Sequence, residues 1–210
     1  TVDGLENSNY AITYVNGKLT VNARTVTLDW GTANSFVYDG KSHTLKPDPK
    51  NVVNNDNLGL TVTVTGENVS GSSAINVGTY TATAQIANEN YVLAESSKTA
   101  TFTITQRTVT LDWGANSFAY DGNAQTLNPT AQNVVSNDNL GLTVTVTGEK
   151  ITGSSAINAG TYTATAQITN ANYVLAEGCK TATFTITTRT LTVKAKDNSI
   201  TYGDKPSAKG

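Results

Sequence analysis

The stretch Thr99–Trp113 reads T-A-T-F-T-I-T-Q-R-T-V-T-L-D-W. Threonine, other β-branched residues and aromatic residues fill most of its positions, and apolar residues alternate with polar ones. An alternation with a period of two is typical of a β-strand that buries one face. The stretch holds no glycine, proline or asparagine that would end a strand. We therefore expect β-structure on both sides of Gln106.

This stretch has two counterparts, because it lies where one copy of a long repeat ends and the next begins. The counterparts are Lys18–Trp30 and Thr181–Ala195. The copies have a period of 82 residues, apart from one additional residue, Thr32, in the first. Self-similarity of this kind indicates a repeat architecture. The sequence predicts the C-terminal fragment of a preceding repeat at 1–23, full repeats at 24–106 and 107–188, and the N-terminal fragment of a following repeat at 189–210.

Short strands separated by turn residues are expected within each copy. In the first copy they lie near 25–30, 36–38, 42–46, 59–65, 68–75, 79–87 and 98–105. This pattern predicts an all-β fold of tandem immunoglobulin-like β-sandwich repeats in a linear array. Asn76–Ala82 and Asn158–Ala164 match a tyrosine corner, which favours the same fold. The alternative, a β-grasp-like repeat, requires a helix across its sheet, and no stretch supplies one.

The apolar positions of the expected strands predict the core. Trp30 and Trp113 share the parity of these positions, so we expect them in the core or at its edge rather than as sugar-stacking platforms. The predicted core comprises Val62, Val64, Tyr80, Ala82, Ile86, Phe102, Ile104 and Leu111, with counterparts in the second copy.

Composition excludes several classes of function. The net charge is −2 and 14 % of the residues are charged, which leaves no basic surface for nucleic acid. No apolar run approaches the roughly 20 residues of a membrane span. The single cysteine, Cys179, has no partner for a disulfide within the chain. Scarce cysteine is compatible with an exported protein.

Short motifs recur in the same order in both copies. In the first they are F-V-Y-D-G at 36–40, N-V-G-T-Y at 76–80, N-Y at 90–91 and T-A-T-F-T-I at 99–104. With these motifs the copies resemble the bacterial surface-protein repeats called MBG and YDG domains, and more loosely bacterial immunoglobulin-like repeats. Residues 9–21 resemble the end of an MBG repeat of the YGX type, and 189–204 the beginning of one. The resemblance implies a secreted or cell-surface, adhesin-like bacterial protein, without activity or shared catalytic residues.

Few side chains invite a chemical role. His43 is the only histidine, and Gln125 replaces it in the second copy, so we expect a surface histidine. Cys179 stands in place of a serine with only one neighbouring cation, which is thin support for a reactive thiol. Asp39 and Asp121 lie in Tyr-Asp-Gly turns, where aspartate commonly bonds its own backbone. No second carboxylate at readable spacing supports acid–base chemistry on sugars.

Two further possibilities are a calcium site and an intramolecular crosslink. The Asn-rich loops around Asp56 and Asp138 each offer one carboxylate, whereas Ca²⁺ prefers six to eight oxygen ligands. Lys98 and Lys180 occupy matching positions, but the last strands hold no Asn or Asp for an isopeptide bond. We therefore expect no catalytic, cofactor-binding or metal site.

The sequence predicts a structural stalk or spacer of a bacterial cell-surface or secreted adhesin-like protein, not an enzyme. Its expected partners are neighbouring repeats of the same chain, with no nucleic acid and no membrane span in this segment. The alternative is a binding module that contacts a host glycan or protein through exposed loops or strand edges. A solvent-facing cluster of Tyr38, Tyr91 and Trp30 would favour the alternative, and their burial would favour the stalk.

The joint between the copies predicts their relative orientation. Apolar residues fall on even numbers at Phe102 and Ile104 and on odd numbers at Val109 and Leu111. Successive side chains of a strand point to opposite faces, so we expect adjacent repeats to be related by roughly a half-turn about the array axis. Superposition of the two repeats in a crystal structure measures this rotation. A rotation below about 60°, with a bulge at Gln106 that resets the phase, would contradict the expectation.

Overall fold

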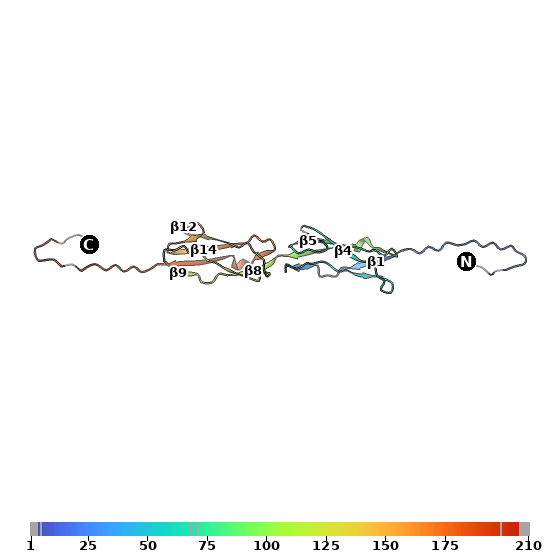
Figure 1. Cartoon of the computed structure of the whole chain (residues 1–210), viewed down its shortest axis with the longest axis horizontal. Helices are drawn as coiled ribbons and strands as arrows, with labels where there is room; N and C mark the ends of the chain where they lie inside the picture. Colours follow the sequence, from blue (N-terminus) through green and yellow to red (C-terminus); the bar gives the residue numbers. More distant parts are fainter. Residues whose placement is uncertain (1–3, 5, 68, 70, 198, 206–210) are drawn as a thin grey trace. The chain divides into compact units, whose positions relative to one another are not determined.

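The computed structural model describes residues 4, 6–67, 69, 71–197 and 199–205. The chain divides after Gln106 into two compact units, each built around one repeat (Figure 1). The described residues are all-β in character, and their only helical elements are two 3₁₀ turns of three residues, η1 (Glu95–Ser97) and η2 (Glu177–Cys179).

The first repeat consists of seven strands. Alternating threonine and apolar residues make β5 the longest, and its partner β7 has the same pattern. The strands are β1 (Arg24–Asp29), β2 (Ser35–Val37), β3 (Asp48–Lys50), β4 (Thr61–Thr65), β5 (Gly78–Gln85), β6 (Tyr91–Leu93) and β7 (Thr99–Thr105).

These strands form two open sheets, ordered β3-β1-β6 and β2-β7-β5-β4. The pairs β1–β3, β4–β5 and β5–β7 are antiparallel. In contrast, β1 runs parallel to β6, with Val26 opposite Leu93, and β2 runs parallel to β7, with Phe36 opposite Ile104. Each sheet therefore joins a strand from the start of the repeat to a strand from its end.

The core lies between the two sheets. Leu28 of β1 and Leu93 of β6 pack with Ala84 of β5, which belongs to the other sheet. Tyr80 and Phe102 are fully buried, and their rings stack with centroids 5.4 Å apart. Their burial confirms the predicted core, as does that of Val64, Ala82, Ile104 and Leu111, whereas Val62 and Ile86 are only half-buried.

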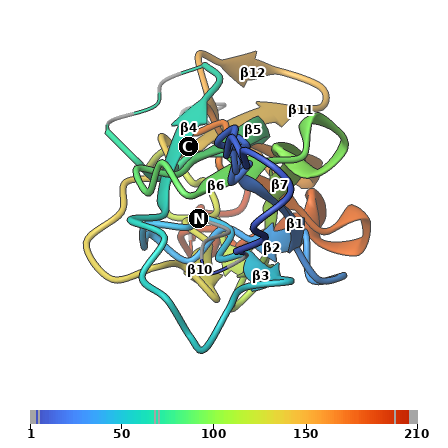
Figure 2. The ribbon, with the colours of Figure 1, turned by 90° about the vertical axis from the view of Figure 1, so that its right-hand side faces the viewer.

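The second repeat has the same two sheets, ordered β10-β8-β15 and β11-β14-β16-β9. An additional short hairpin, β12–β13, lies beside β11 (Figure 2). Its strands are β8 (Arg107–Asp112), β9 (Ser117–Ala119), β10 (Thr130–Gln132), β11 (Thr143–Thr147), β12 (Ile151–Thr152), β13 (Ser155–Ala156), β14 (Gly160–Gln167), β15 (Tyr173–Leu175) and β16 (Thr181–Thr187).

Two expected strands of the first repeat are wrong, and two short strands are found where none is expected. Residues 42–46 form no strand, and only His43 makes an isolated bridge, with Ala74. The expected strand at 68–75 falls partly outside the described residues, and its described part contains only that bridge. The unexpected strands β3 and β6 have three residues each, which is too short to show a period of two.

The structure confirms the tyrosine corner in both repeats. The Tyr80 hydroxyl donates to the backbone carbonyl of Asn76 at 2.7 Å, and Tyr162 donates to Asn158 at 2.8 Å. A Cβ on Gly66 would lie 2.6 Å from the ring of Tyr80, so only glycine allows this close approach. The loop before β5 is thereby fixed to the first turn of the strand.

Replacing Tyr80 with phenylalanine tests this contact. We expect Tyr80→Phe to lower the free energy of unfolding by about 1 kcal/mol, because the ring keeps its packing and one hydrogen bond is lost. Urea unfolding of the full chain measures the change, and Tyr10→Phe, at an exposed tyrosine, is the control. Equal stability of the two variants would show that the hydroxyl contributes nothing.

Candidate functional site

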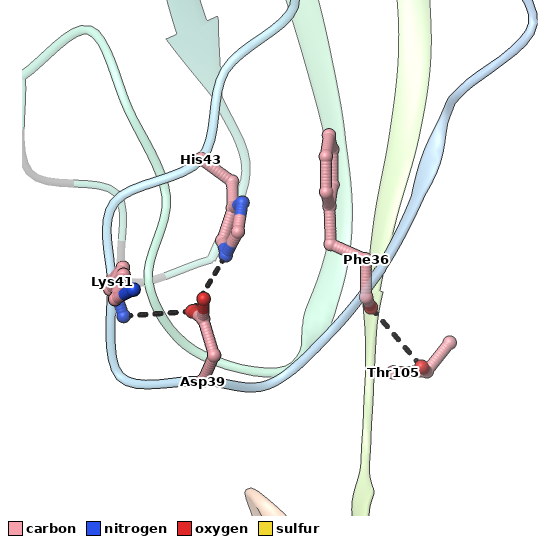
Figure 3. A network of polar contacts seen from close by, with 5 residues as sticks. All are labelled: Phe36, Asp39, Lys41, His43 and Thr105. Carbon is pink, nitrogen blue, oxygen red and sulfur yellow. Dashed lines mark hydrogen bonds and ion pairs between the residues drawn. The ribbon is translucent and has the colours of Figure 1, made fainter.

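His43 closes the Tyr-Asp-Gly turn of the first repeat (Figure 3). Its Nε2 lies 2.8 Å from Oδ1 of Asp39, and its ring stacks on Phe36 with centroids 4.5 Å apart. The backbone amide of Lys41 donates to the same carboxylate oxygen at 2.9 Å. The side chain of His43 is only 17 % exposed, so the expectation of a surface histidine is wrong. The stacking and the hydrogen bond hold the ring against the fold.

The electrostatics of this turn are those of a hydrogen-bonded aspartate. The hydrogen bond with His43, and then the one from the Lys41 amide, hold the pKa of Asp39 below its usual value. In the second repeat the Asn123 backbone amide is the main cause that lowers the pKa of Asp121. Gln125 takes the place of the histidine there and donates to Asp121 at 3.3 Å. A neutral amide serves the same turn, so the geometry requires a hydrogen-bond donor and not a titratable group.

A buried tyrosine holds each Asn-rich loop. The Tyr173 hydroxyl donates to Oδ2 of Asp138 at 2.6 Å and accepts the amide of Val135 at 3.0 Å. Tyr91 and Asp56 form the same bond in the first repeat, at 2.7 Å. One oxygen of the carboxylate considered for calcium is therefore engaged within the fold. Among the described residues, no three His, Cys, Asp or Glu side chains gather as they would around a metal ion.

A second contact fixes the start of each repeat. Arg24 Nε donates to the backbone carbonyl of Asn51 at 2.9 Å, and the Asn51 side-chain amide donates to the carbonyl of Thr25 at 2.8 Å. Asn51 has φ of +67°, a conformation that asparagine adopts more readily than most residues. Arg107 and Asn133 repeat the arrangement. Strand periodicity does not predict these contacts, and the available signal is that both residues recur in the second copy.

The two tryptophans and the cysteine share one location. Trp30 Nε1 donates to the carbonyl of Ser97 at 2.7 Å, and Trp113 Nε1 donates to the carbonyl of Cys179 at 2.9 Å. Both indole rings are half-buried against the core, which confirms their expected place at its edge. The Cys179 thiol lies 3.2 Å from the carbonyl of Ala176. The sulfur thus fills the position of a structural serine.

The lysines considered for a crosslink form ion pairs instead. Lys98 Nζ lies 3.0 Å from Glu95 Oε1, and Lys180 pairs in the same way with Glu177. Both glutamates are exposed, so the pairs contribute little to stability. No candidate residue is therefore brought to a second reactive group, and the polar side chains described above hold loops and strand ends.

The family model of the MBG domain matches residues 25–108 and again residues 107–190. The chain belongs to the MBG domain family. MBG repeats are a non-catalytic domain type, typical of the repeat regions of surface proteins. A comparison with curated proteins found no match. In the described part of this MBG chain, no helix is long and apolar enough to cross a membrane.

Removing the hydroxyl of Tyr173 tests the contact with the Asn-rich loop. We expect Tyr173→Phe to lower the free energy of unfolding by about 1.5–3 kcal/mol, because a hydrogen bond to a charged carboxylate is lost. Tyr202→Phe, at an exposed tyrosine of the same unit, should have no effect. Urea unfolding at neutral pH compares the two variants, and equal stability would contradict the assignment.

The same tyrosine predicts a dependence on pH. Burial, followed by the hydrogen bond with Asp138, raises the pKa of Tyr173 above its usual value of 10.0. A raised pKa in the folded state means that the stabilisation is complete below the unfolded-state pKa and is lost as the pH rises through the folded-state value. Above about pH 10 the parent chain should therefore lose stability more steeply than Tyr173→Phe. Parallel pH profiles would contradict this expectation.

Proposed function

We propose that the chain is a stalk segment of a secreted or cell-surface, adhesin-like bacterial protein. The observation that carries the proposal is the joint: β7 ends at Thr105 and β8 begins at Arg107, so only Gln106 separates the two repeats. Each repeat nevertheless has its own sheets and core. A row of self-contained domains with one-residue connections suits a spacer that holds another part of the protein away from the cell.

The proposal includes the division of the chain. Full repeats at 24–106 and 107–188 would lie between parts of neighbouring repeats at 1–23 and 189–210. Membership of a surface-protein repeat family and the scarcity of cysteine support an extracellular location. Neighbouring repeats are then the natural partners of each domain.

The placement of the aromatic residues favours the stalk over a glycan-binding module. Tyr91 is 7 % exposed and Tyr38 is 5 % exposed, while the indole N–H of Trp30 is bonded within the fold. Flat aromatic faces that would stack on a sugar are therefore committed to packing and hydrogen bonding. The exception is Tyr120, which is 39 % exposed in the second repeat.

The alternative function is binding of a host glycan or protein, and the observation that favours it is the pair of edge strands β4 and β11. Each is the last strand of its four-stranded sheet. An edge strand presents a row of backbone donors and acceptors to which an extended peptide can add. The β12–β13 hairpin lies near the edge of β11.

A binding screen of the full chain against glycans and host matrix proteins tests the proposal. The stalk predicts no saturable binding to any immobilised ligand. Saturable binding that is abolished by Thr145→Pro in the middle of β11, or by Tyr120→Ala, would favour the binding module. Circular dichroism of each variant controls for loss of the fold.

A further inference from the structure

Both ends of the described chain are exposed strand-like segments outside the two sandwiches. Every described residue of 6–23 and of 189–205 is exposed, and neither segment belongs to a sheet. Large apolar side chains are included, for example Leu19 at 90 % and Leu191 at 84 % exposure. Apolar residues that alternate with polar ones in this way normally lie against a partner.

The full repeats show what these segments correspond to. In the N-terminal segment, 10–12 aligns with β6 and 18–21 aligns with the buried half of β7. In the C-terminal segment, 189–194 aligns with β1 and 199–201 aligns with β2. We call residues 9–23 the tail segment and residues 189–204 the head segment.

The sheet topology makes head and tail complementary. Within a repeat, β1 pairs with β6 and β2 pairs with β7, and both pairs are parallel. The head segment supplies the first member of each pair, and the tail segment supplies the second. Transferring the register places Leu191 opposite Ile12, as Val26 lies opposite Leu93. It places Ile200 opposite Val21, as Phe36 lies opposite Ile104.

We propose that the head segment of one molecule pairs with the tail segment of a second copy in this register. The pairing forms two parallel ladders whose apolar rows face each other, as the corresponding rows do inside each repeat. Leu191 and Val193 take the places of Val26 and Leu28, both of which are buried in the first repeat. No counterpart of β5 is present in either segment, so the association is weaker than folding of a complete repeat.

Chain order favours a second copy as the partner. The tail segment precedes both complete repeats and the head segment follows them, so each molecule carries one head and one tail. Contact between unlike surfaces of identical molecules is heterologous, and it continues from one molecule to the next. The expected product is therefore a series of head-to-tail oligomers rather than a closed dimer.

Disulfide trapping in the full chain tests the register. In a Cys179→Ser background, Ala11→Cys and Thr190→Cys are opposite each other, as Val92 and Thr25 are in the first repeat. Combining Ala11→Cys with Thr192→Cys is the matched control, because two residues along a strand exceed the Cα separation that a disulfide spans. We expect the first pair to give a reducible ladder of dimers, trimers and higher species, several-fold more abundant than from the control.

Three outcomes of the trapping experiment would overturn the proposal. These are the absence of a ladder, equal ladders from both pairs, and a crosslink confined to single molecules, which would show that head and tail meet within one chain. Sedimentation of unlinked protein gives an independent reading. The average mass should rise with concentration for the parent chain and for Thr192→Asp, and should stay that of a monomer for Leu191→Asp. Retained association of Leu191→Asp would contradict the predicted apolar face.

Discussion

Parallel pairing between the first and last strands closes each repeat, and the rest of the fold depends on it. The amide of Arg24 donates to the carbonyl of Asn90, and the amide of Ala94 donates to the carbonyl of Val26, both at 2.9 Å. The amide of Tyr38 donates to the carbonyl of Thr105 at the same distance. Neither sheet is complete until the end of the repeat has been added, so the core forms only from the entire repeat.

Side-chain contacts stabilise the structure where the strands are too short to do so. The strands β3 and β6 have three residues each and make few ladder hydrogen bonds. Tyr91 binds the Asp56 loop beside β6, and Arg24 binds Asn51 directly after β3. The same contacts recur in the second repeat. Polar residues that could suggest chemistry in the sequence thus hold loops, which agrees with a non-catalytic domain family.

The extent to which the sequence predicts the structure follows from these lengths. Alternation over five to eight residues correctly predicts β1, β4, β5 and β7, and the tyrosine corner follows from a local motif. Residues 42–46 also alternate, but they pair only through the bridge at His43. Periodicity cannot distinguish an extended loop from a strand, because both point alternate side chains to opposite sides. The stacking of His43 on Phe36 and the bond between Tyr91 and Asp56 join distant residues, so no local pattern predicts them.

A stalk bears tension along its chain, which pulls β1 from its start and β7 from its end. In this direction the hydrogen bonds of the β1–β6 pair are loaded together rather than one after another. Ala94 has φ of −63°, so proline fits there and removes only the amide that donates to Val26.

Single-molecule pulling on the two chain ends tests this account most directly. If parallel closure bears the load, Ala94→Pro lowers the unfolding force of one repeat and leaves the other unchanged, while Ala94→Ser, which keeps the amide, unfolds like the parent. Equal unfolding forces for Ala94→Pro and the parent chain would show that the β1–β6 pair does not hold the repeat closed.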